Sequence, residues 1–240
     1  MTSGGMNRYL RTVSPTGPEP FDPDALSHLY RERFSEGDIA FKKEMWDVLC
    51  ERVFQRYVQP SDTVLDLGAG RCEFINAINA AEKIAVDINP DLAKYARGAR
   101  VVQTPSTDLG PIDSGTVDVA FSSNFLEHLP DKTSVLQTLA ECRRVLRAGG
   151  AMIVLMPNIR YLPGRYWDYF DHHTPLTHLS LVEALTLSGF RAERVIPRFL
   201  PYTVKQRGMP RSTALLRLYL SLRVVWPIFG RQMLVVARTV

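Results

Sequence analysis

Cysteine is scarce in this chain of 240 residues, which has three, Cys50, Cys72 and Cys142. Cysteines so far apart form neither a disulfide framework nor the paired spacing of a zinc site, and they favour a reducing compartment. The sequence also has no secretory signal pattern and no run of roughly eighteen uncharged apolar residues that would span a bilayer. We therefore expect a cytoplasmic protein.

Acidic residues are absent from the C-terminal part of the chain. From Arg194 to Val240 there are nine Lys or Arg and no Asp or Glu, whereas the net charge of the whole chain is only +4. The first 193 residues are therefore net acidic. A basic end on an otherwise acidic chain favours an anionic partner.

The composition is that of a single α/β core with extensions, since 45% of the residues are hydrophobic. The first 23 residues hold four prolines and three glycines, so residues 1–37 are expected to form a mobile tail. Residues 38–59 are expected to be helical. Their apolar side chains recur at helical spacing, as shown by Phe41, Met45, Val48, Leu49, Val53 and Phe54.

A strand, a glycine turn and a helix start are predicted between Val64 and Phe74. Gly68 and Gly70 carry no Cβ, so a small cofactor can approach the backbone, and the helix offers free N–H groups. A dinucleotide-binding turn would need a third glycine, but no glycine follows before Gly98. Asp66 would repel a pyrophosphate, and it suits a cofactor that carries positive charge.

Strands and helices alternate over residues 63–156. Apolar strands are predicted at Lys83–Asp87, Arg100–Gln103, Val117–Ser122 and Ala151–Met156, and a helix is predicted at Thr133–Arg147, before the stop signal Gly149-Gly150. This alternation predicts a parallel sheet with helices on both faces. Asp87, at the tip of its strand, is placed to accept hydrogen bonds from ribose hydroxyls.

The segment VLDLGAGRC resembles motif I of the class I S-adenosylmethionine (SAM) dependent methyltransferases, with Cys72 in place of the last glycine. The Glu-His-Leu segment at 127–129 is similar to one found after the fourth strand of many of them. The resemblance implies a Rossmann-like α/β sheet of seven strands, mostly parallel, whose last strand is antiparallel. It implies SAM as cofactor, S-adenosylhomocysteine as product, and a cofactor site made of Asp66, Gly68, Gly70, Asp87, Ile88, Asp108, Leu109 and Asn124, in which Asp108 holds the adenine amino group.

The resemblance also divides the chain into parts. Residues 38–59 would cover the cofactor cleft, and residues 60–198 would form the cofactor-binding core with an acceptor loop at 157–180. Strand six is expected at Arg191–Pro197 and strand seven at Gln232–Thr239, within a final segment 232–240. Residues 199–231 would then be a basic insertion between the last two strands.

The acceptor loop is rich in aromatic residues and histidine. Tyr161, Tyr166 and Trp167 are predicted to contact the substrate, together with His178, for which a structural role is an equal alternative. Transfer to a hydroxyl requires alignment and removal of a proton, for which an imidazole is suited. Candidates for this base are His128, His172 and His173, and since residues 172 and 173 point opposite ways in an extended segment, only one of them can face the site.

The acceptor loop also holds Asp168 and Asp171, which together with its histidines are suitable metal ligands. No metal-ligand spacing is present, so no metal site is predicted. Ser180 is expected to cap a helix over residues 181–188.

The loop and the following THLSLVEALTLSGF are similar to bacterial methyltransferases that act on sugars, glycans and secondary metabolites. We therefore expect O-methylation of a saccharide or glycoconjugate, lipid-linked forms included. Alternatives are methylation of a quinone or polyketide hydroxyl, and a SAM-binding protein without catalysis. Nucleic-acid methylation is disfavoured, because residues 122–125 are Ser-Ser-Asn-Phe and not (Asn/Asp)-Pro-Pro-aromatic.

Within the basic insertion, Thr213–Trp226 is predicted to form an amphipathic helix with a polar stripe of Thr213, Arg217 and Ser221. Two interpretations stay open. The helix packs on the protein's own surface or on a second subunit, or residues 211–229 contact a membrane surface or a lipid-linked substrate.

Overall fold

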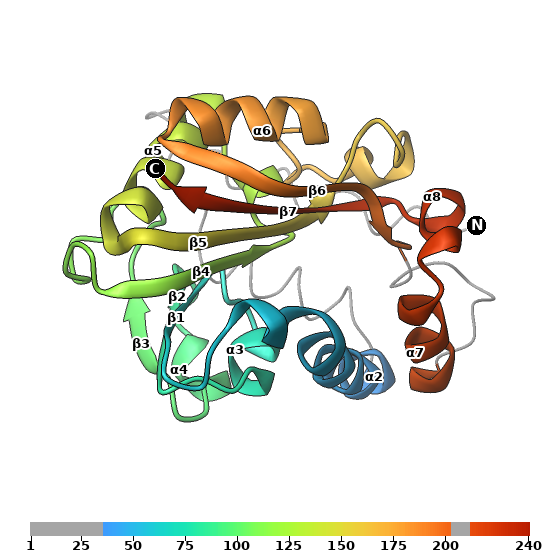
Figure 1. Cartoon of the computed structure of the whole chain (residues 1–240), viewed down its shortest axis with the longest axis horizontal. Coiled ribbons are helices and arrows are strands. Elements are labelled where there is room, and N and C mark those ends of the chain that lie inside the picture. Colours follow the sequence, from blue (N-terminus) through green and yellow to red (C-terminus); the bar gives the residue numbers. More distant parts are fainter. Residues whose placement is uncertain (1–35, 203–211) are drawn as a thin grey trace, which may run out of the picture. The chain divides into compact units, whose positions relative to one another are not determined.

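The computed structural model describes residues 36–202 and 212–240 (Figure 1). The tail expected over residues 1–37 lies outside the described residues, except for its last two positions. Residues 203–211, which belong to the expected basic insertion, also lie outside them.

Seven strands form one sheet in the order β3-β2-β1-β4-β5-β7-β6. β7 pairs antiparallel with β5 and with β6, whereas the other neighbouring pairs are parallel. The predicted fold class is confirmed. The strands are β1 (Thr63–Leu67), β2 (Glu82–Asp87), β3 (Arg100–Gln103), β4 (Val117–Ser123), β5 (Leu146–Pro157), β6 (Phe190–Leu200) and β7 (Gln232–Thr239).

The sheet separates two hydrophobic cores. Because side chains alternate along a strand, Val64 of β1 belongs to one core and Leu65 and Leu67 belong to the other. Helices cover both faces, with α2 and α3 on the side of Val64 and α5 and α6 on the side of Leu65 (Figure 1). The α-helices are α2 (Glu36–Leu49), α3 (Glu73–Ala77), α4 (Leu92–Tyr95), α5 (Lys132–Val145), α6 (His178–Leu187), α7 (Thr213–Ser221) and α8 (Trp226–Phe229).

Short helical turns extend several of these helices. α2 continues through a π turn η1 (Cys50–Phe54) and a 3-10 turn η2 (Gln55–Tyr57), so a helical segment runs from residue 36 to residue 57 where residues 38–59 were expected. The other 3-10 turns are η3 (Leu126–His128), η4 (Arg165–Asp168) and η5 (Arg223–Val225).

Two helix ends differ from the prediction. α5 ends at Val145 and not at Arg147, because Leu146 turns to an extended conformation, is buried and pairs with Val117 as the first residue of β5. α6 begins at His178, and its cap is Thr177, whose side chain accepts the amide of Ser180. Ser180 is the third helical residue, and its side-chain hydroxyl accepts the backbone amide of Thr177 in return, so the two residues form a capping box.

The helix predicted over Thr213–Trp226 is broken at Leu222, which leaves the helical conformation between α7 and η5. Leu220 is buried and the Tyr219 hydroxyl donates to the Phe199 carbonyl at 2.7 Å, so one side of α7 packs on the protein's own core. Leu215 and Leu218 are about half exposed on this helix, at 48% and 55%. The membrane contact of residues 211–229 stays a prediction.

None of the helices in the described part of the chain combines the length and the apolar character needed to cross a membrane.

An aromatic cluster joins α2, η1, α3 and β4. It consists of Trp46, Phe54, Phe74 and Phe121, with ring centroids 3.6 Å apart for Phe74 and Phe121 and 4.9 Å apart for Phe54 and Phe121. All four side chains are buried. The cluster anchors the first described helix to the sheet.

We predict that Phe54→Ala lowers the free energy of unfolding by about 3–5 kcal/mol, because Phe54 has no exposed surface and its removal leaves a cavity in the cluster. Urea denaturation measures the change. Leu136→Ala on the outer side of α5, where the side chain is 36% exposed, is the control and should cost about 1 kcal/mol or less. A similar loss in both variants would contradict this account of the cluster.

Candidate active site

The turn after β1 has an unusual backbone. Gly68, Gly70 and Cys72 all have positive φ, at 69°, 54° and 61°. A Cβ on Gly68 would overlap the ring of Phe125, whereas a Cβ on Gly70 would meet nothing within 4 Å. Gly68 is therefore required by packing inside the protein, and Gly70 borders open space where another molecule can approach the backbone.

Asp87 connects this turn to the end of β2. Its carboxylate accepts the amide of Gly70 at 2.8 Å and the amide of Asn89 at 2.9 Å. These two hydrogen bonds fix the carboxylate at the carboxyl end of the strand, beside the glycine turn. Ile88 follows directly and is 51% exposed, an apolar surface next to the acid.

Asp66 is a buried acid in the middle of the sheet, paired with Ala85 and Phe121 on its two neighbouring strands. Burial raises the pKa of its carboxyl well above the usual range, and the nearby acids Glu73 and Asp87 raise it further. Glu73 forms an ion pair with Lys42 of α2 at 2.9 Å. Asp66, Glu73 and Asp87 therefore lie near one another beside the turn, and a cationic group bound there would favour the ionised form of Asp66.

The remaining predicted cofactor residues lie in different surroundings. Asp108 is exposed and accepts the amide of Gly110 at 3.0 Å. The side chain of Leu109 is fully buried in the core, and its amide donates to Glu141 at 2.7 Å. Asn124 is exposed at the end of β4 with a φ of 47°. The cofactor roles of these three residues stay predictions.

Cys72 occupies the position of the third glycine in the turn, and it is buried. Burial is the main cause that raises the pKa of its thiol to about 12, and Asp66 adds to the effect. The thiol is thus neutral at physiological pH, and the residue serves as a small apolar filler.

A second group of side chains surrounds His128, at the end of η3. The His128 Nδ1 lies 2.9 Å from the carbonyl oxygen of Asp171 and 3.4 Å from the carboxylate oxygen Oδ2 of the same residue. The His172 ring lies 4.8 Å from the His128 ring, and the His172 Nδ1 lies 2.5 Å from the Tyr166 carbonyl. The structure therefore brings His128, His172 and Tyr166 together.

These hydrogen bonds assign the tautomer of each ring. A carbonyl oxygen can only accept, so Nδ1 of His128 and Nδ1 of His172 carry the proton, and Nε2 of each ring has the lone pair. His178 is different. The Asn158 amide donates to its Nδ1 at 3.1 Å, and burial lowers the pKa of this imidazole.

The other residues that were predicted to act on the methyl acceptor are His173, Tyr161 and Trp167, and each has different surroundings. His173 is exposed, with its ring 6.0 Å from that of Phe170. Tyr161 stacks on His178 at 6.2 Å and lies under the Arg198 guanidinium. The Trp167 indole donates to the Leu162 carbonyl at 2.7 Å.

Sequence reasoning did not single out Glu127, although it is part of the Glu-His-Leu segment. The Glu127 side chain is fully buried and accepts the Tyr166 hydroxyl at 2.7 Å, and burial raises the pKa of its carboxyl. Among the described residues, no hydrogen-bond partner reaches its second oxygen, Oε2. Its place in the Glu-His-Leu segment, directly before the candidate base His128, is the signal by which the sequence could have identified it.

One group in the described ranges has the composition of a metal site. His128, Asp171 and His172 each offer a ligand atom, and these atoms lie within 4.8 Å of one another. Asp168, which the sequence placed with these candidates, is exposed and does not belong to this group.

The two groups meet through Phe125. Its ring lies against Gly68 of the turn, and its carbonyl accepts the amide of His128 at 2.9 Å. The glycine turn and the histidine group therefore lie at the same edge of the sheet, beyond the carboxyl ends of β1 and β4.

Residues 65–154 match the sequence model of a family described as "Methyltransferase domain". A protein of Mycolicibacterium smegmatis named as a probable S-adenosylmethionine-dependent methyltransferase is 37% identical over 169 residues, which are 66% of this chain and 64% of that protein. A 37.1 kDa protein of unknown function from a Streptomyces fradiae transposon is 29% identical over 148 residues, 57% of this chain and 40% of that protein. The chain thus spans about two fifths to two thirds of the length of these relatives.

Solved structures with a similar fold include a methyltransferase bound to the Trm112 methyltransferase activator of Haloferax volcanii. It has a TM-score of 0.67 and 18% identity, over 92% of this chain and 99% of that chain. A SAM-dependent methyltransferase of Archaeoglobus fulgidus has a TM-score of 0.63 and 22% identity, over 89% of this chain and 99% of that chain. The strand order and the antiparallel β7 are those of the class I methyltransferase fold, and residues 65–154 within it are similar in sequence to the methyltransferase domain family.

Proposed function

We propose that the protein methylates a hydroxyl oxygen of a saccharide or glycoconjugate, with His128 as the general base. The observation that carries the proposal is the hydrogen bond from His128 Nδ1 to the Asp171 carbonyl, at 2.9 Å. It fixes the ring and leaves the lone pair on Nε2, which is the arrangement that a proton acceptor requires.

The residues at the turn after β1 fit SAM. Gly70 borders open space, the fixed carboxylate of Asp87 suits the ribose hydroxyls, and the acids Asp66 and Glu73 suit a cofactor with positive charge. When bound there, SAM supplies a methyl group on a sulfonium sulfur, which is already a good leaving group.

The chain's own residues then have two tasks. The first is to align the acceptor, and effects of this kind account for much of the acceleration in two-substrate reactions. The second is to accept the hydroxyl proton as the oxygen forms its new bond, which we assign to His128 Nε2. Asp171 orients the ring, and the carboxylate 3.4 Å from Nδ1 stabilises the imidazolium that results.

Aromatic rings around His128 favour a saccharide as acceptor. Tyr166 packs on His172 with ring centroids 4.2 Å apart and contacts Trp167 at 5.1 Å. Tyr166 is itself buried, but Trp167 is only partly buried, so a sugar ring can stack on it while the sugar hydroxyls bind polar groups. A quinone or polyketide ring would also stack there, so it is the competing acceptor class.

The acceptor class is tested by incubating the protein with methyl-labelled SAM and a bacterial extract, which is then separated into organic, polar and polymeric fractions. Label in polar or polymeric sugars, or label in the organic fraction that mild acid moves to water, supports a saccharide. Label in the organic fraction that resists mild acid indicates a quinone or polyketide. Binding of SAM with no transfer into any fraction would show a binding protein without catalysis.

We predict that His128→Gln slows the initial rate of labelling by about 10²–10⁴-fold at saturating SAM, because it removes the base. Calorimetry should show unchanged SAM affinity. His173→Gln, at an exposed position of the same loop, is the control and should keep the wild-type rate. A wild-type rate in His128→Gln would refute the assignment of the base.

A second prediction separates the base from a metal ion held by His128, Asp171 and His172. Dialysis against EDTA should leave the labelling rate unchanged, because the proposal assigns the lone pair of His128 Nε2 to the hydroxyl proton, and a nitrogen bound to a metal cannot accept that proton. If activity were lost on dialysis and restored by a divalent cation, the group would be a metal site.

Asp66→Asn should weaken SAM binding at least about tenfold, equivalent to about 1.4 kcal/mol, and at the same time stabilise the protein without SAM. The pKa of Asp66 is raised in the folded state, so its ionised form costs stability. This cost is absent below the unfolded pKa of about 3.9 and grows as the pH rises through the folded pKa. The stability advantage of the variant should therefore increase with pH.

Thermal unfolding at several pH values measures the advantage, and calorimetry measures SAM affinity. Asp113→Asn, at an exposed aspartate, is the matched control and should show neither effect. An Asp66→Asn variant with wild-type affinity would show that this acid does not serve the cofactor.

A further inference from the structure

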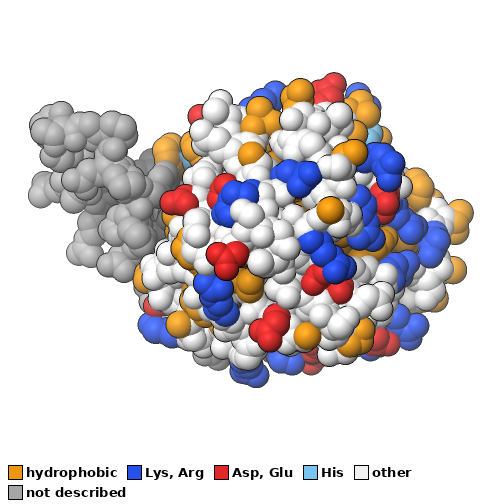
Figure 2. All heavy atoms as spheres, turned by 60° about the vertical axis from the view of Figure 1, so that its left-hand side comes forward, with side chains coloured by type: hydrophobic (Ala, Val, Ile, Leu, Met, Phe, Trp, Pro, Cys, Tyr) orange, Lys and Arg blue, Asp and Glu red, His pale blue; other side chains and the backbone are white. Residues whose placement is uncertain are grey.

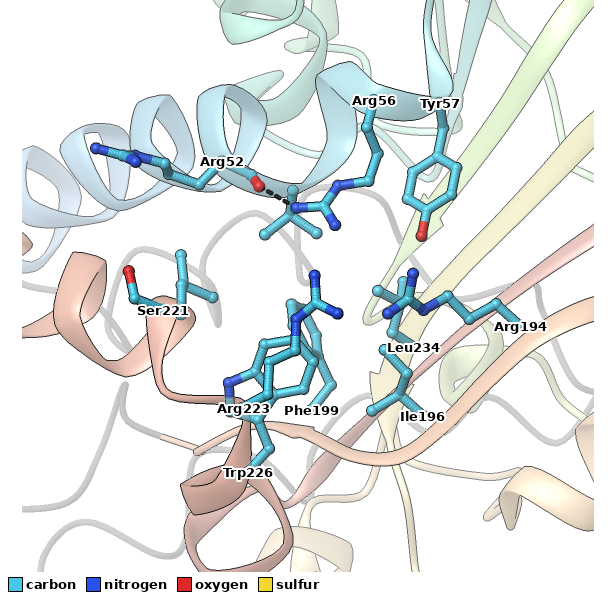
Figure 3. A pocket seen from close by; sticks show the side chains of 12 residues that line it. Arg52, Arg56, Tyr57, Arg194, Ile196, Phe199, Ser221, Arg223, Trp226 and Leu234 are labelled. Atoms are coloured by element: carbon cyan, nitrogen blue, oxygen red, sulfur yellow. Dashed lines mark hydrogen bonds between the residues drawn. The ribbon is translucent and has the colours of Figure 1, made fainter.

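A pocket with four arginines lies away from the candidate active site. It has a volume of about 130 Å³ and is bounded by η1 and η2, by β6 and β7, and by the segment α7–α8 (Figure 3). We call it the arginine pocket, after Arg52, Arg56, Arg194 and Arg223, which line it. It shares no residue with the glycine turn or with the histidine group.

Three of these arginines, Arg56, Arg194 and Arg223, turn their guanidinium groups toward one another in the pocket, whereas the Arg52 side chain points away and its carbonyl faces the pocket (Figure 3). Arg52 and Arg56 are four residues apart on the helical segment, and the Arg56 guanidinium donates to the Arg52 carbonyl (Figure 3). On β6, a register shift between Ala192 and Arg194 pairs Arg194 with Val236 of β7. Because cross-strand partners share a face, this bulge turns Arg194 to the face of Val236 and Ile196.

The pocket carries positive charge that its own lining does not neutralise. None of the described residues that line it is acidic. Arg52 Nε lies 3.2 Å from Glu51, but Arg217 already binds both oxygens of that carboxylate, at 3.0 and 2.8 Å. This interaction with Arg217 also lowers the pKa of Glu51.

Several arginines elsewhere on the molecule have acidic partners. Arg144 lies 2.8 Å from Glu141, and Arg147 lies 2.6 Å from Asp118. On the face seen in Figure 2, basic and acidic side chains are interspersed. The arginine pocket departs from this pattern, and converging guanidinium groups are the side chains that best match the oxygens of a phosphate.

The floor of the pocket is apolar. Phe199 and Trp226 are buried beneath it, with ring centroids 5.0 Å apart, and Arg223 lies over the Trp226 ring at 5.9 Å. Tyr57 adds a hydroxyl group at the edge (Figure 3), whereas the Ser221 hydroxyl donates to the Arg217 carbonyl at 2.9 Å. A water molecule takes roughly 30 Å³, so the volume corresponds to a few waters or to one phosphate group.

We propose that the arginine pocket binds the phosphate or diphosphate group of an organic ester, with the guanidinium groups on the oxygens and the aromatic floor against the organic part. The site lies on a face of the sheet, whereas SAM is expected at its carboxyl edge. It is thus a second binding site, independent of the proposed methyl transfer.

The test uses inorganic pyrophosphate as the probe, in calorimetry at constant ionic strength, since phosphate contacts depend on salt. The wild-type protein should bind it, and Arg56→Gln/Arg194→Gln should bind at least about tenfold more weakly. The matched control is Arg97→Gln/Arg191→Gln, which removes the same charge at exposed arginines outside the pocket and should bind like the wild type. Thermal unfolding verifies that each variant is folded, and Arg194→Gln alone replaces the double variant if that one unfolds.

A second arm identifies the source of the phosphate. Vesicles of phosphatidylcholine with and without phosphatidylglycerol are sedimented with each protein. Binding to the anionic vesicles that pyrophosphate competes away, and that the pocket variant loses, assigns the site to a lipid headgroup. Pyrophosphate binding without vesicle binding assigns it to a free phosphate ester.

Two results would overturn the proposal. One is the absence of pyrophosphate binding and of vesicle binding by the wild type. The other is equal weakening in the pocket variant and in the control variant, which would mean that the protein responds to net charge and not to a built site.

Discussion

The proposed methyl transfer depends on the parallel pairing of β1 with β2 on one side and with β4 on the other. From β1 the chain proceeds outward to β2 and β3, and it then returns to the opposite side for β4 and β5. At such a reversal the connections leave the strand ends in opposite directions, and a crevice forms at the carboxyl edge. The glycine turn, Asp87 and the segment from Asn124 to His128 all begin at this edge.

The strands could be predicted from the sequence because they are short apolar runs between breakers, and buried parallel strands are read in this way. The glycine turn was equally readable, since Gly70 has a local backbone requirement. The ends of the helices were harder to predict from the sequence. Leu146 leaves α5 because it pairs with Val117, 29 residues earlier, and no local signal reports such a pairing.

The candidate site could be predicted only in part, for the same reason. The sequence identified His128 and His172 as candidates, but not their proximity, because His128 and its partner Asp171 are 43 residues apart. It also could not distinguish His172 from His173, which depends on the path of the loop. The arginine pocket could not be predicted from the sequence, because a bulge in β6 decides on which face of the sheet Arg194 lies.

The basic C-terminal part shows that the net charge of a segment does not tell which of its arginines are available to an anionic partner. The guanidinium of Arg217 is bound by Glu51, Arg238 pairs with Glu193 at 3.2 Å, and Arg198 donates to the carbonyls of Ile228 and Gly230. These arginines serve the fold by attaching α7, β7 and α8 to their neighbours. Arg194 and Arg223, in contrast, line the arginine pocket together with Arg52 and Arg56. The site that we propose for an anionic partner is therefore built by two segments that lie far apart in the sequence.

The contact between Phe125 and Gly68 has a consequence for how such an enzyme diverges. The ring excludes every side chain at position 68, and the same residue holds the amide of His128. In the proposed reaction, a replacement at any of these three positions would therefore disturb the SAM side and the acceptor side together. The segment after Pro157 carries no such coupling to the glycine turn in the described contacts. In the proposed reaction, exchange of that segment would change the acceptor side, including the partner of His128, and would leave the contacts of the glycine turn with Asp87 in place.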